Sequence, residues 1–153
     1  QSDITYIPIG NRHYYATFII DVYTKKIVGY QVTDHMRATA NVAALKMALK
    51  EHAAPQIHHS DRGSQFRSGD YQRLLKQNGL VCSMSAVGHC GDNAACEGFF
   101  GVLKRDRINR TKYWTLDAAK AGVFNYIERF HNPRMRRRVA KRDMKFQAIL
   151  NRP

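Results

Sequence analysis

The stretch "IHHSDRGSQF", residues 57–66, decides the fold. Its apolar start and its Ser-Asp-Arg-Gly continuation are typical of a strand that ends in a turn. The stretch "TANVAALKMALKEH" (39–52) precedes it, with apolar residues at helical spacing and Thr39 as the expected N-cap. A helix that crosses between two strands predicts that the strands pair in parallel. The short strand therefore indicates a sheet that is not purely antiparallel.

The rest of the chain extends this pattern to a mixed α/β fold. Runs of Ile, Val, Tyr and Phe predict strands at 3–9, 14–23, 26–32, 55–60 and 80–84. Helical periodicity predicts helices at 39–52, 68–79, 93–108 and 115–131. We expect Ser68 to cap the second of these helices and Asn132-Pro133 to end the last. The element order predicts a mixed five-stranded sheet flanked by helices.

Composition limits the class of protein. The chain has 153 residues, of which 44% are hydrophobic, enough for one domain with a core. We see no apolar run long enough to span a bilayer and no signal peptide. Three cysteines without paired spacing predict reduced thiols in a cytosolic protein. Because the chain starts with Gln-Ser-Asp and not with Met, we expect it to lie within a longer protein.

The net charge of +13 is concentrated at one end of the chain. Residues 1–100 hold ten Lys/Arg and eight Asp/Glu, whereas residues 101–153 hold fifteen and four. The two parts therefore carry +2 and +11. Solubility alone explains this asymmetry poorly. The distribution favours a polyanion as partner, most often nucleic acid.

Three acids are candidates for a metal site. Asp61 follows the fourth expected strand, Asp3 lies near the start of the first, and Glu97 lies in the third helix. Each has a structural alternative, and for Asp61 this is an ordinary turn. Asp21 is a rival for Asp3, because a first hairpin turning near residue 11 would bring them close. Three carboxylates held together repel unless cations bind, and oxygen ligands favour Mg²⁺ or Mn²⁺.

The chain resembles the catalytic domain of the Asp-Asp-Glu transposases of bacterial insertion sequences, which are related to retroviral integrases. The resemblance covers nearly all of residues 2–131. It rests on "SDITYIP", "FIIDVYTKKIVGYQV", "IHHSDRGSQF", "SMSAVGHCGDNAACEGFFGVLKRD" and, more loosely, "AAKAGVFNYIERFHN". Between Asp61 and Glu97 lie 35 residues, the interval typical of this family.

The resemblance implies a ribonuclease-H-like fold with a catalytic triad of Asp3, Asp61 and Glu97 holding two Mg²⁺ ions, for which Mn²⁺ can substitute. It implies cutting of donor DNA ends and joining of the 3′ hydroxyl to target DNA, by a homo-oligomer assembled on DNA in the bacterial cytoplasm. We expect a catalytic core at 1–131 and a basic tail at 132–153, with a short helix packed on the core.

The departures from the family leave other functions open. Gly98 stands where the family has Ser, and the sequence after Asn132 is altered, which puts DNA binding and transposition in question. A ribonuclease-H-like nuclease without joining, or an inactive DNA-binding remnant, is the alternative. His89, Cys90 and Cys96 form a weak zinc pattern. The expected DNA contacts, each with a solvated surface residue as its alternative, are Ser64, Gln65, Asn93, Lys104, Arg136, Arg137 and Arg138.

Overall fold

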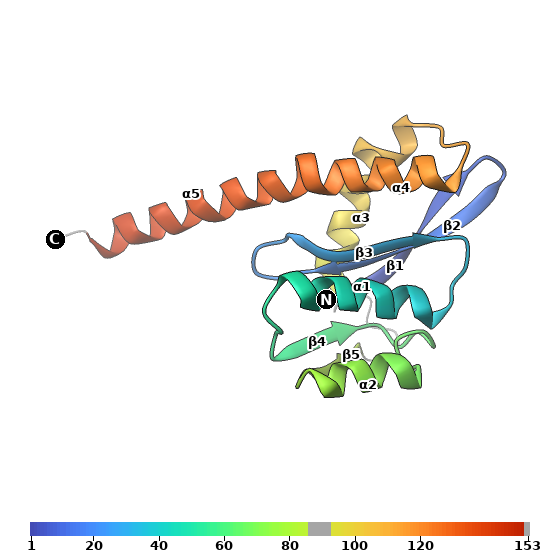
Figure 1. Ribbon diagram of the computed structural model, residues 1–153. Helices are drawn as coiled ribbons and strands as arrows, with labels where there is room; N and C mark the ends of the chain where they lie inside the picture. The colour runs from blue at the N-terminus through green and yellow to red at the C-terminus, as the bar shows by residue number, and fades with distance from the viewer. Residues whose placement is uncertain (86–92, 152–153) are drawn as a thin grey trace.

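The computed structural model describes residues 1–85 and 93–151. Within them, one mixed sheet has the strand order β3-β2-β1-β4-β5, flanked by helices (Figure 1). The strands are β1 (Ser2–Ile9), β2 (Arg12–Ile20), β3 (Ile27–Thr33), β4 (Ile57–Ser60) and β5 (Val81–Met84). The helices are α1 (Ala38–Glu51), α2 (Gly69–Gln77), α3 (Ala94–Asp106), η2 (Ile108–Arg110), α4 (Leu116–Asn125), η3 (Tyr126–His131) and α5 (Asn132–Leu150). The expected mixed five-stranded sheet is confirmed.

The strand pairing places the first and fourth strands side by side. β1 pairs with β2 antiparallel and with β4 parallel, and in the second pair Ser2 lies opposite Ser60. β4 and β5 are also parallel. Because Asp3 follows Ser2 and Asp61 follows Ser60, the parallel pairing brings both acids to the same edge of the sheet. The predicted parallel pairing of β4 is confirmed, but its partner is β1 and not β3, the strand that α1 connects to it.

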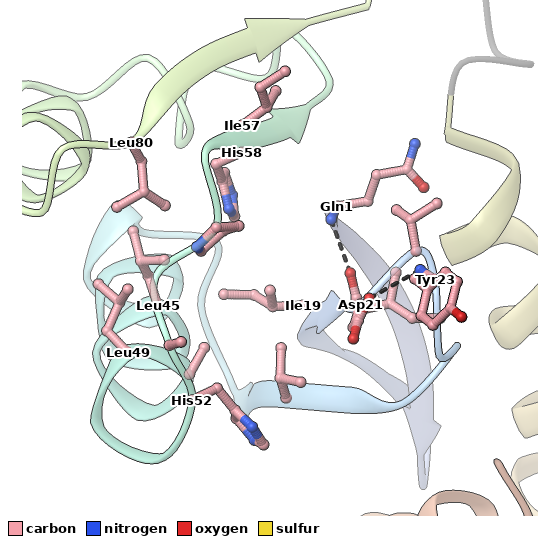
Figure 2. Close-up of a pocket in the computed structure, with 16 residues that line it drawn as sticks. Gln1, Ile19, Asp21, Tyr23, Leu45, Leu49, His52, Ile57, His58 and Leu80 are labelled. Atoms are coloured by element: carbon pink, nitrogen blue, oxygen red, sulfur yellow. Dashed lines mark hydrogen bonds between the residues drawn. The ribbon is translucent and has the colours of Figure 1, made fainter. Parts of the chain in front are cut away.

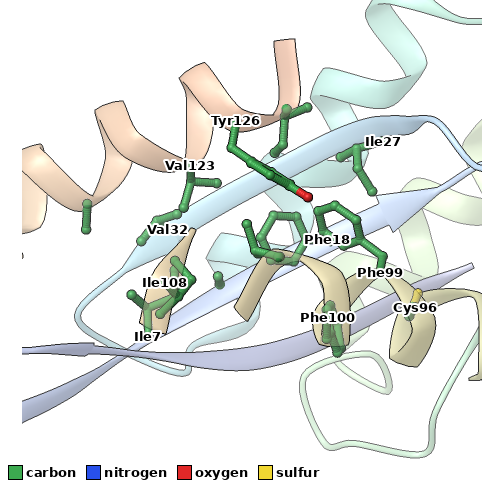
Figure 3. Packing of buried hydrophobic residues seen from close by; sticks show 14 of the residues in the cluster. Ile7, Phe18, Ile27, Val32, Cys96, Phe99, Phe100, Ile108, Val123 and Tyr126 are labelled. Atoms are coloured by element: carbon green, nitrogen blue, oxygen red, sulfur yellow. The ribbon is translucent and has the colours of Figure 1, made fainter. Parts of the chain in front are cut away.

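Helices cover both faces of the sheet and enclose two apolar clusters. On one face, Phe18 of β2 packs edge-on against Phe99 of α3, with ring centroids 5.1 Å apart (Figure 3). Val123 of α4 is buried in the same cluster. On the other face, Leu45 of α1 and Leu75 of α2 lie in the second cluster. Odd and even positions of β1 alternate between these clusters, as the two-residue repeat of a strand requires.

Two of the expected element ends are confirmed and two are wrong. The Ser68 hydroxyl accepts a hydrogen bond from the Tyr71 amide at 3.4 Å, and Gly79 follows α2 with a φ of 69°. Thr39, in contrast, is not an N-cap, because α1 begins at Ala38 and the extended Arg37 takes the N-cap position. β2 ends at Ile20 and not at residue 23, because Asp21 starts a turn there.

The last helix does not end at Asn132-Pro133, which corrects the prediction. The chain remains helical from Leu116 to Leu150 through the π-helical turn η3. In this turn the Asn132 amide donates to the carbonyl of Ile127, five residues earlier. The wider turn accommodates Pro133, whose missing N–H and ring are tolerated in the first turn of α5. The expected division of the chain at residue 131 stays a prediction.

The side chain of Asn132 fixes the start of α5 to the sheet. Its Oδ1 accepts from the Ile27 amide at 2.9 Å, and its Nδ2 donates to the Ile27 carbonyl at 2.8 Å. β3 is an edge strand, so these backbone groups have no further strand to pair with. Asn132 thus acts as a substitute for one residue of a sixth strand.

We expect Asn132→Ala to lower the free energy of unfolding by about 2–3 kcal/mol, because two buried backbone groups lose their partners. Urea denaturation measures the change. Arg136→Ala, on an exposed position of the same helix, should stay within about 0.5 kcal/mol of the wild type. Equal midpoints for Asn132→Ala and the wild type would show that the Asn132 contacts do not contribute.

Candidate active site

Asp3 is a half-buried carboxylate on β1, on the face of the sheet that packs against α3. Its Oδ1 accepts a hydrogen bond from the Ile4 amide at 2.7 Å. Burial, aided by the negative charges of Asp61 and Glu97, raises the pKa of Asp3 to about 6, although the hydrogen bond from Ile4 lowers it. Asp61 and Glu97 therefore lie close enough to Asp3 to act on it electrostatically in the folded chain.

Asp61 follows β4 in a turn that uses only one of its two oxygens. Its Oδ1 accepts from the Gly63 amide at 2.9 Å. A Cβ atom on Gly63 would lie 2.9 Å from the same oxygen, so the turn favours glycine there. Arg62 holds the turn to the end of β5 through a 2.8 Å bond from its Nε to the Ser85 carbonyl. The turn interpretation and the ligand interpretation of Asp61 are thus compatible.

Glu97 lies in the first turn of α3 and is exposed. Asn93, directly before α3, is buried with 5% of its surface exposed. Its amide lies close enough to lower the pKa of Asp3, yet neither its Oδ1 nor its Nδ2 has a hydrogen-bond partner of good geometry among the described residues. A buried amide without partners is costly, so it marks a place where a ligand or a small movement is needed.

The chemistry of these groups suits a hard cation, although their spacing does not yet form a complete site. The carboxylates of Asp3, Asp61 and Glu97 offer oxygen ligands, which Mg²⁺ prefers. A cation would offset the carboxylate repulsion that raises the pKa of Asp3. In the described parts of the chain, however, no group of three or more His, Cys, Asp and Glu is arranged so that it could hold a metal ion.

The expected DNA-contacting residues differ in exposure. Ser64 and the arginines Arg136, Arg137 and Arg138 are exposed, and Gln65 and Lys104 are partly exposed. Asn93 is buried beside Asp3, and its predicted contact with DNA stays a prediction. Nothing in the sequence pattern distinguished it from a surface residue, because its burial depends on packing between α3 and β1.

Asp21, the rival first acid, has a structural role. The register places Phe18 opposite Asp3, so Asp21 lies beyond the end of β2. Its Oδ1 accepts from the Tyr23 amide at 2.9 Å, and its Oδ2 from the Thr24 hydroxyl at 2.8 Å. Burial alone would raise the pKa of Asp21, but these hydrogen bonds outweigh it and hold the pKa below its usual value.

The zinc alternative has little support from the residues described. Cys96 is 1% exposed, and burial raises the pKa of its thiol to about 12, so that the thiolate a metal needs is disfavoured. Its position among the aromatic side chains of α3 is that of a core residue (Figure 3). His89 and Cys90 lie outside the described residues.

The two histidines of the opening stretch are engaged in the sheet. His59 lies 2.9 Å from the Ser83 hydroxyl and 3.1 Å from that of Ser85. The buried His58 places its Nε2 3.0 Å from the Ser2 hydroxyl and 2.8 Å from the Tyr71 hydroxyl. Burial, aided by nearby positive charge, lowers the pKa of His58 to about 4. His58 is therefore neutral at pH 7, with its Nε2 within hydrogen-bond distance of both hydroxyls.

We expect His58 to make the fold sensitive to acid. In the unfolded chain its pKa is near 6.5, so between pH 6.5 and 4 the unfolded state binds a proton that the folded state does not. Stability is fully present above about pH 6.5 and falls as the pH drops, by about 2–3 kcal/mol at pH 4.5. In His58→Gln the loss of stability between pH 7.5 and 4.5, read from the urea midpoints, should be smaller than in the wild type by this amount. The exposed His52→Gln should keep the wild-type difference, and a wild-type difference in His58→Gln would contradict the assignment.

The most enclosed pocket is separate from the three acids. It has a volume of about 410 Å³ and lies between α1, the end of β2 and β4 (Figure 2). Its lining is largely apolar, with Leu45, Leu49 and Leu80. None of the three acids lines it.

Comparison with known proteins identifies the class of this fold and site. The family described as "Integrase core domain" matches residues 1–90, and a second family of the same description matches residues 97–145. The chain belongs to the integrase core domain family. None of the described helices is long and apolar enough to cross a membrane.

Two curated relatives are proteins of bacterial insertion sequences. The 31 kDa protein of insertion element IS600 from Shigella sonnei is 41% identical over 137 residues, which cover 88% of this chain and 50% of the relative. Transposase InsF for insertion sequence IS3A from Escherichia coli K12 is 40% identical over 132 residues, covering 85% and 46%. The chain thus spans about half the length of these relatives.

Solved structures confirm the ribonuclease-H-like fold. The catalytic core domain of HTLV-2 integrase, solved in complex with magnesium, matches with a TM-score of 0.65 and 16% identity over 84% of each chain. The catalytic domain of Mos1 transposase matches with a TM-score of 0.67 and 11% identity, covering 82% of this chain and 68% of that one. The mixed sheet with helices on both faces is the architecture of integrase and transposase catalytic cores.

Proposed function

We propose that the chain is the catalytic core of a bacterial transposase that cuts DNA at the ends of a mobile element and joins these ends to target DNA. The observation that carries the proposal is the electrostatic coupling of Asp3 to Asp61 and Glu97, at an edge of the sheet formed by parallel β1 and β4. Family membership and the insertion-sequence relatives support it. We place the activity in the bacterial cytoplasm.

The proposed chemistry consists of two phosphoryl transfers. In the first, water attacks a phosphodiester, and the P–O bond that breaks leaves a free 3′ hydroxyl on the element end. In the second, this hydroxyl attacks a phosphodiester of the target, forming one P–O bond while another breaks. Two bound Mg²⁺ ions, for which Mn²⁺ can substitute, would lower the pKa of the attacking group and stabilise the leaving oxygen.

The residues of the chain provide positions for these ions and for DNA. Asp3 and the free oxygen of Asp61 would hold them from adjacent strand ends, and Glu97 would complete the ligand set from α3. Since the described arrangement does not yet hold a metal, the side chains must move together on binding. The amide of Asn93, beside Asp3, is placed to orient that carboxylate. Ser64, Gln65 and Lys104 would contact the DNA phosphates around the acids.

Crystals soaked in Mn²⁺ and measured by anomalous scattering test the site. We expect a peak between Asp3, Asp61 and Glu97 that disappears in Asp61→Asn. A peak elsewhere, or one that the substitution leaves in place, would overturn the metal assignment. DNA assays then distinguish the activities: cutting without joined products would favour the nuclease, and metal-independent binding without cutting would favour the inactive remnant.

A further inference from the structure

A cleft lies between the β2–β3 turn and α5, and neither the triad nor the core accounts for it. It has a volume of about 490 Å³ and is lined by Tyr23, Thr24 and Lys25 on one side and by one face of α5 on the other. In α5 only Asn132 and Met135 are buried, and the helix extends away from the sheet (Figure 1). The exposed part of α5 thus forms an arm with the cleft at its base.

The cleft is strongly basic. Its lining includes Lys25, Arg138, Lys141, Arg142 and Lys145 and no acidic residue. Asp143, next to Arg142 on α5, forms an exposed 3.5 Å ion pair with it. Five like charges around one cleft repel one another. An anion in the cleft would convert this repulsion into attraction.

Two contacts hold the walls of the cleft in place. The guanidinium carbon of Arg142 lies 4.1 Å from the centre of the Tyr23 ring, a cation–π contact that joins α5 to the turn. Lys25 has a φ of 61°, a left-handed conformation that costs a lysine about 1 kcal/mol or more. The Lys25 amide donates to the Asp21 carbonyl at 2.7 Å, and the His131 Nε2 donates to the Lys25 carbonyl at 2.8 Å. These two hydrogen bonds therefore hold Lys25 in a backbone conformation that glycine would adopt at a lower cost.

The cleft is connected to the acids through α3. The ring of His131 packs edge-on against Phe99, with centroids 4.8 Å apart, while its Nε2 binds the Lys25 carbonyl. Phe99 lies two residues after Glu97 on α3. A single aromatic contact thus separates the lysine of the cleft from the helix that carries the third acid.

The spacing of the cations fits a phosphodiester backbone. From Arg138 to Lys145 is seven residues, or about 10.5 Å along the helix at about 1.5 Å per residue. Three phosphate steps of about 3.4 Å each, measured along the axis of duplex DNA, cover the same length. Lys141 lies between the two, near the middle of this row. A row of cations of this length suits several phosphates of a strand better than it suits a single anion.

We propose that this cleft is a DNA-binding site that holds several phosphates of one strand beside the active site. The proposal rests on the proposed function, since it supplies DNA to the same acids. It also distinguishes between the three arginines that the sequence predicts to contact DNA. Arg138 lines the cleft, whereas Arg136 and Arg137 do not. At about 100° per residue, Arg136 lies on nearly the opposite side of α5 from Arg138 and Lys145.

Two double variants of equal charge test the site. Arg138→Gln with Lys145→Gln removes two cations from the cleft, and Arg136→Gln with Arg137→Gln removes two from the same helix outside it. Fluorescence anisotropy of a labelled DNA duplex, measured between 50 and 200 mM salt, gives the affinity and its salt dependence. We expect the cleft variant to bind about tenfold more weakly or worse at 150 mM, with the log–log salt slope smaller by about two. The control should change binding by less than about twofold.

Equal losses in the two variants, or no loss in the cleft variant, would overturn the proposal, provided that both melt at the wild-type temperature. Binding of the wild type to phosphatidylserine vesicles as tight as to DNA at the same salt would also overturn it. Metal-dependent cutting by the wild type separates this proposal from the proposed function. If cutting occurs but the cleft variant binds DNA normally, the cleft proposal alone fails. If the cleft variant loses DNA binding but the wild type never cuts, the proposed function alone fails.

Discussion

Asp61→Asn and Glu97→Gln should each reduce DNA cutting and joining by on the order of 10³-fold or more. A metal ion contributes several kcal/mol of transition-state stabilisation, and each 1.36 kcal/mol corresponds to about tenfold in rate. Loss of one carboxylate removes a ligand as well as the charge that attracts the ion. The measurement is the rate of Mg²⁺-dependent strand cutting and joining on duplexes that carry element ends, at saturating protein.

The fold should survive both substitutions, which distinguishes lost chemistry from lost structure. In Asp61→Asn the amide oxygen can still accept from the Gly63 amide, so the turn remains satisfied. Removing either charge also relieves Asp3, whose pKa both acids raise. The melting temperature at pH 7 should therefore stay the same or rise. Asp70→Asn, which changes an exposed acid in α2 paired with Arg73, is the control that should keep full activity. Joining retained in either triad variant would rule out the triad.

The sheet was predictable from sequence, because it follows from local rules. Alternating apolar runs set the strands, and a helix between two strands implies parallel pairing. Asp3, at the start of β1, comes close to Asp61, after the end of β4, only through the offset register that pairs Ser2 with Ser60, which no local rule predicts. The resemblance to transposases supplied Glu97, which has no local signal. The distance between the three carboxylates could not be predicted, because it depends on how α3 packs on β1.

The features missed by the sequence analysis all depend on contacts between distant segments. Pro133 indicated a helix end, but the side chain of Asn132 pairs with Ile27, 105 residues away, and the π-helical turn before it accommodates the ring. Lys25 looked like an ordinary turn residue, and its left-handed backbone is held by His131 from the far end of the chain. Such pairs have no periodicity, so neither spacing nor propensity reveals them.

Gly29→Ala should lower the free energy of unfolding by about 3 kcal/mol or more. A Cβ atom at Gly29 of β3 would lie 2.2 Å from the carbonyl oxygen of Ala44 and 3.1 Å from the Cβ of Ala48. Both atoms belong to α1, and a backbone carbonyl in a helix cannot turn aside as a flexible side chain can. The helix must move off the sheet, which opens the apolar cluster that holds Leu45.

Gly101→Ala is the matched control, because the same methyl group is added where nothing lies within 4 Å. Gly101 is exposed within α3, so alanine should raise stability by about 0.5–1 kcal/mol through helix propensity and a less flexible unfolded chain. Thermal melting should separate the two variants by about 7–16 °C, since about 2–4 °C corresponds to 1 kcal/mol in a domain of this size. A wild-type melting temperature for Gly29→Ala would mean that α1 can shift without cost. In that case the close approach of α1 to β3 would not determine how the helix is seated on the sheet.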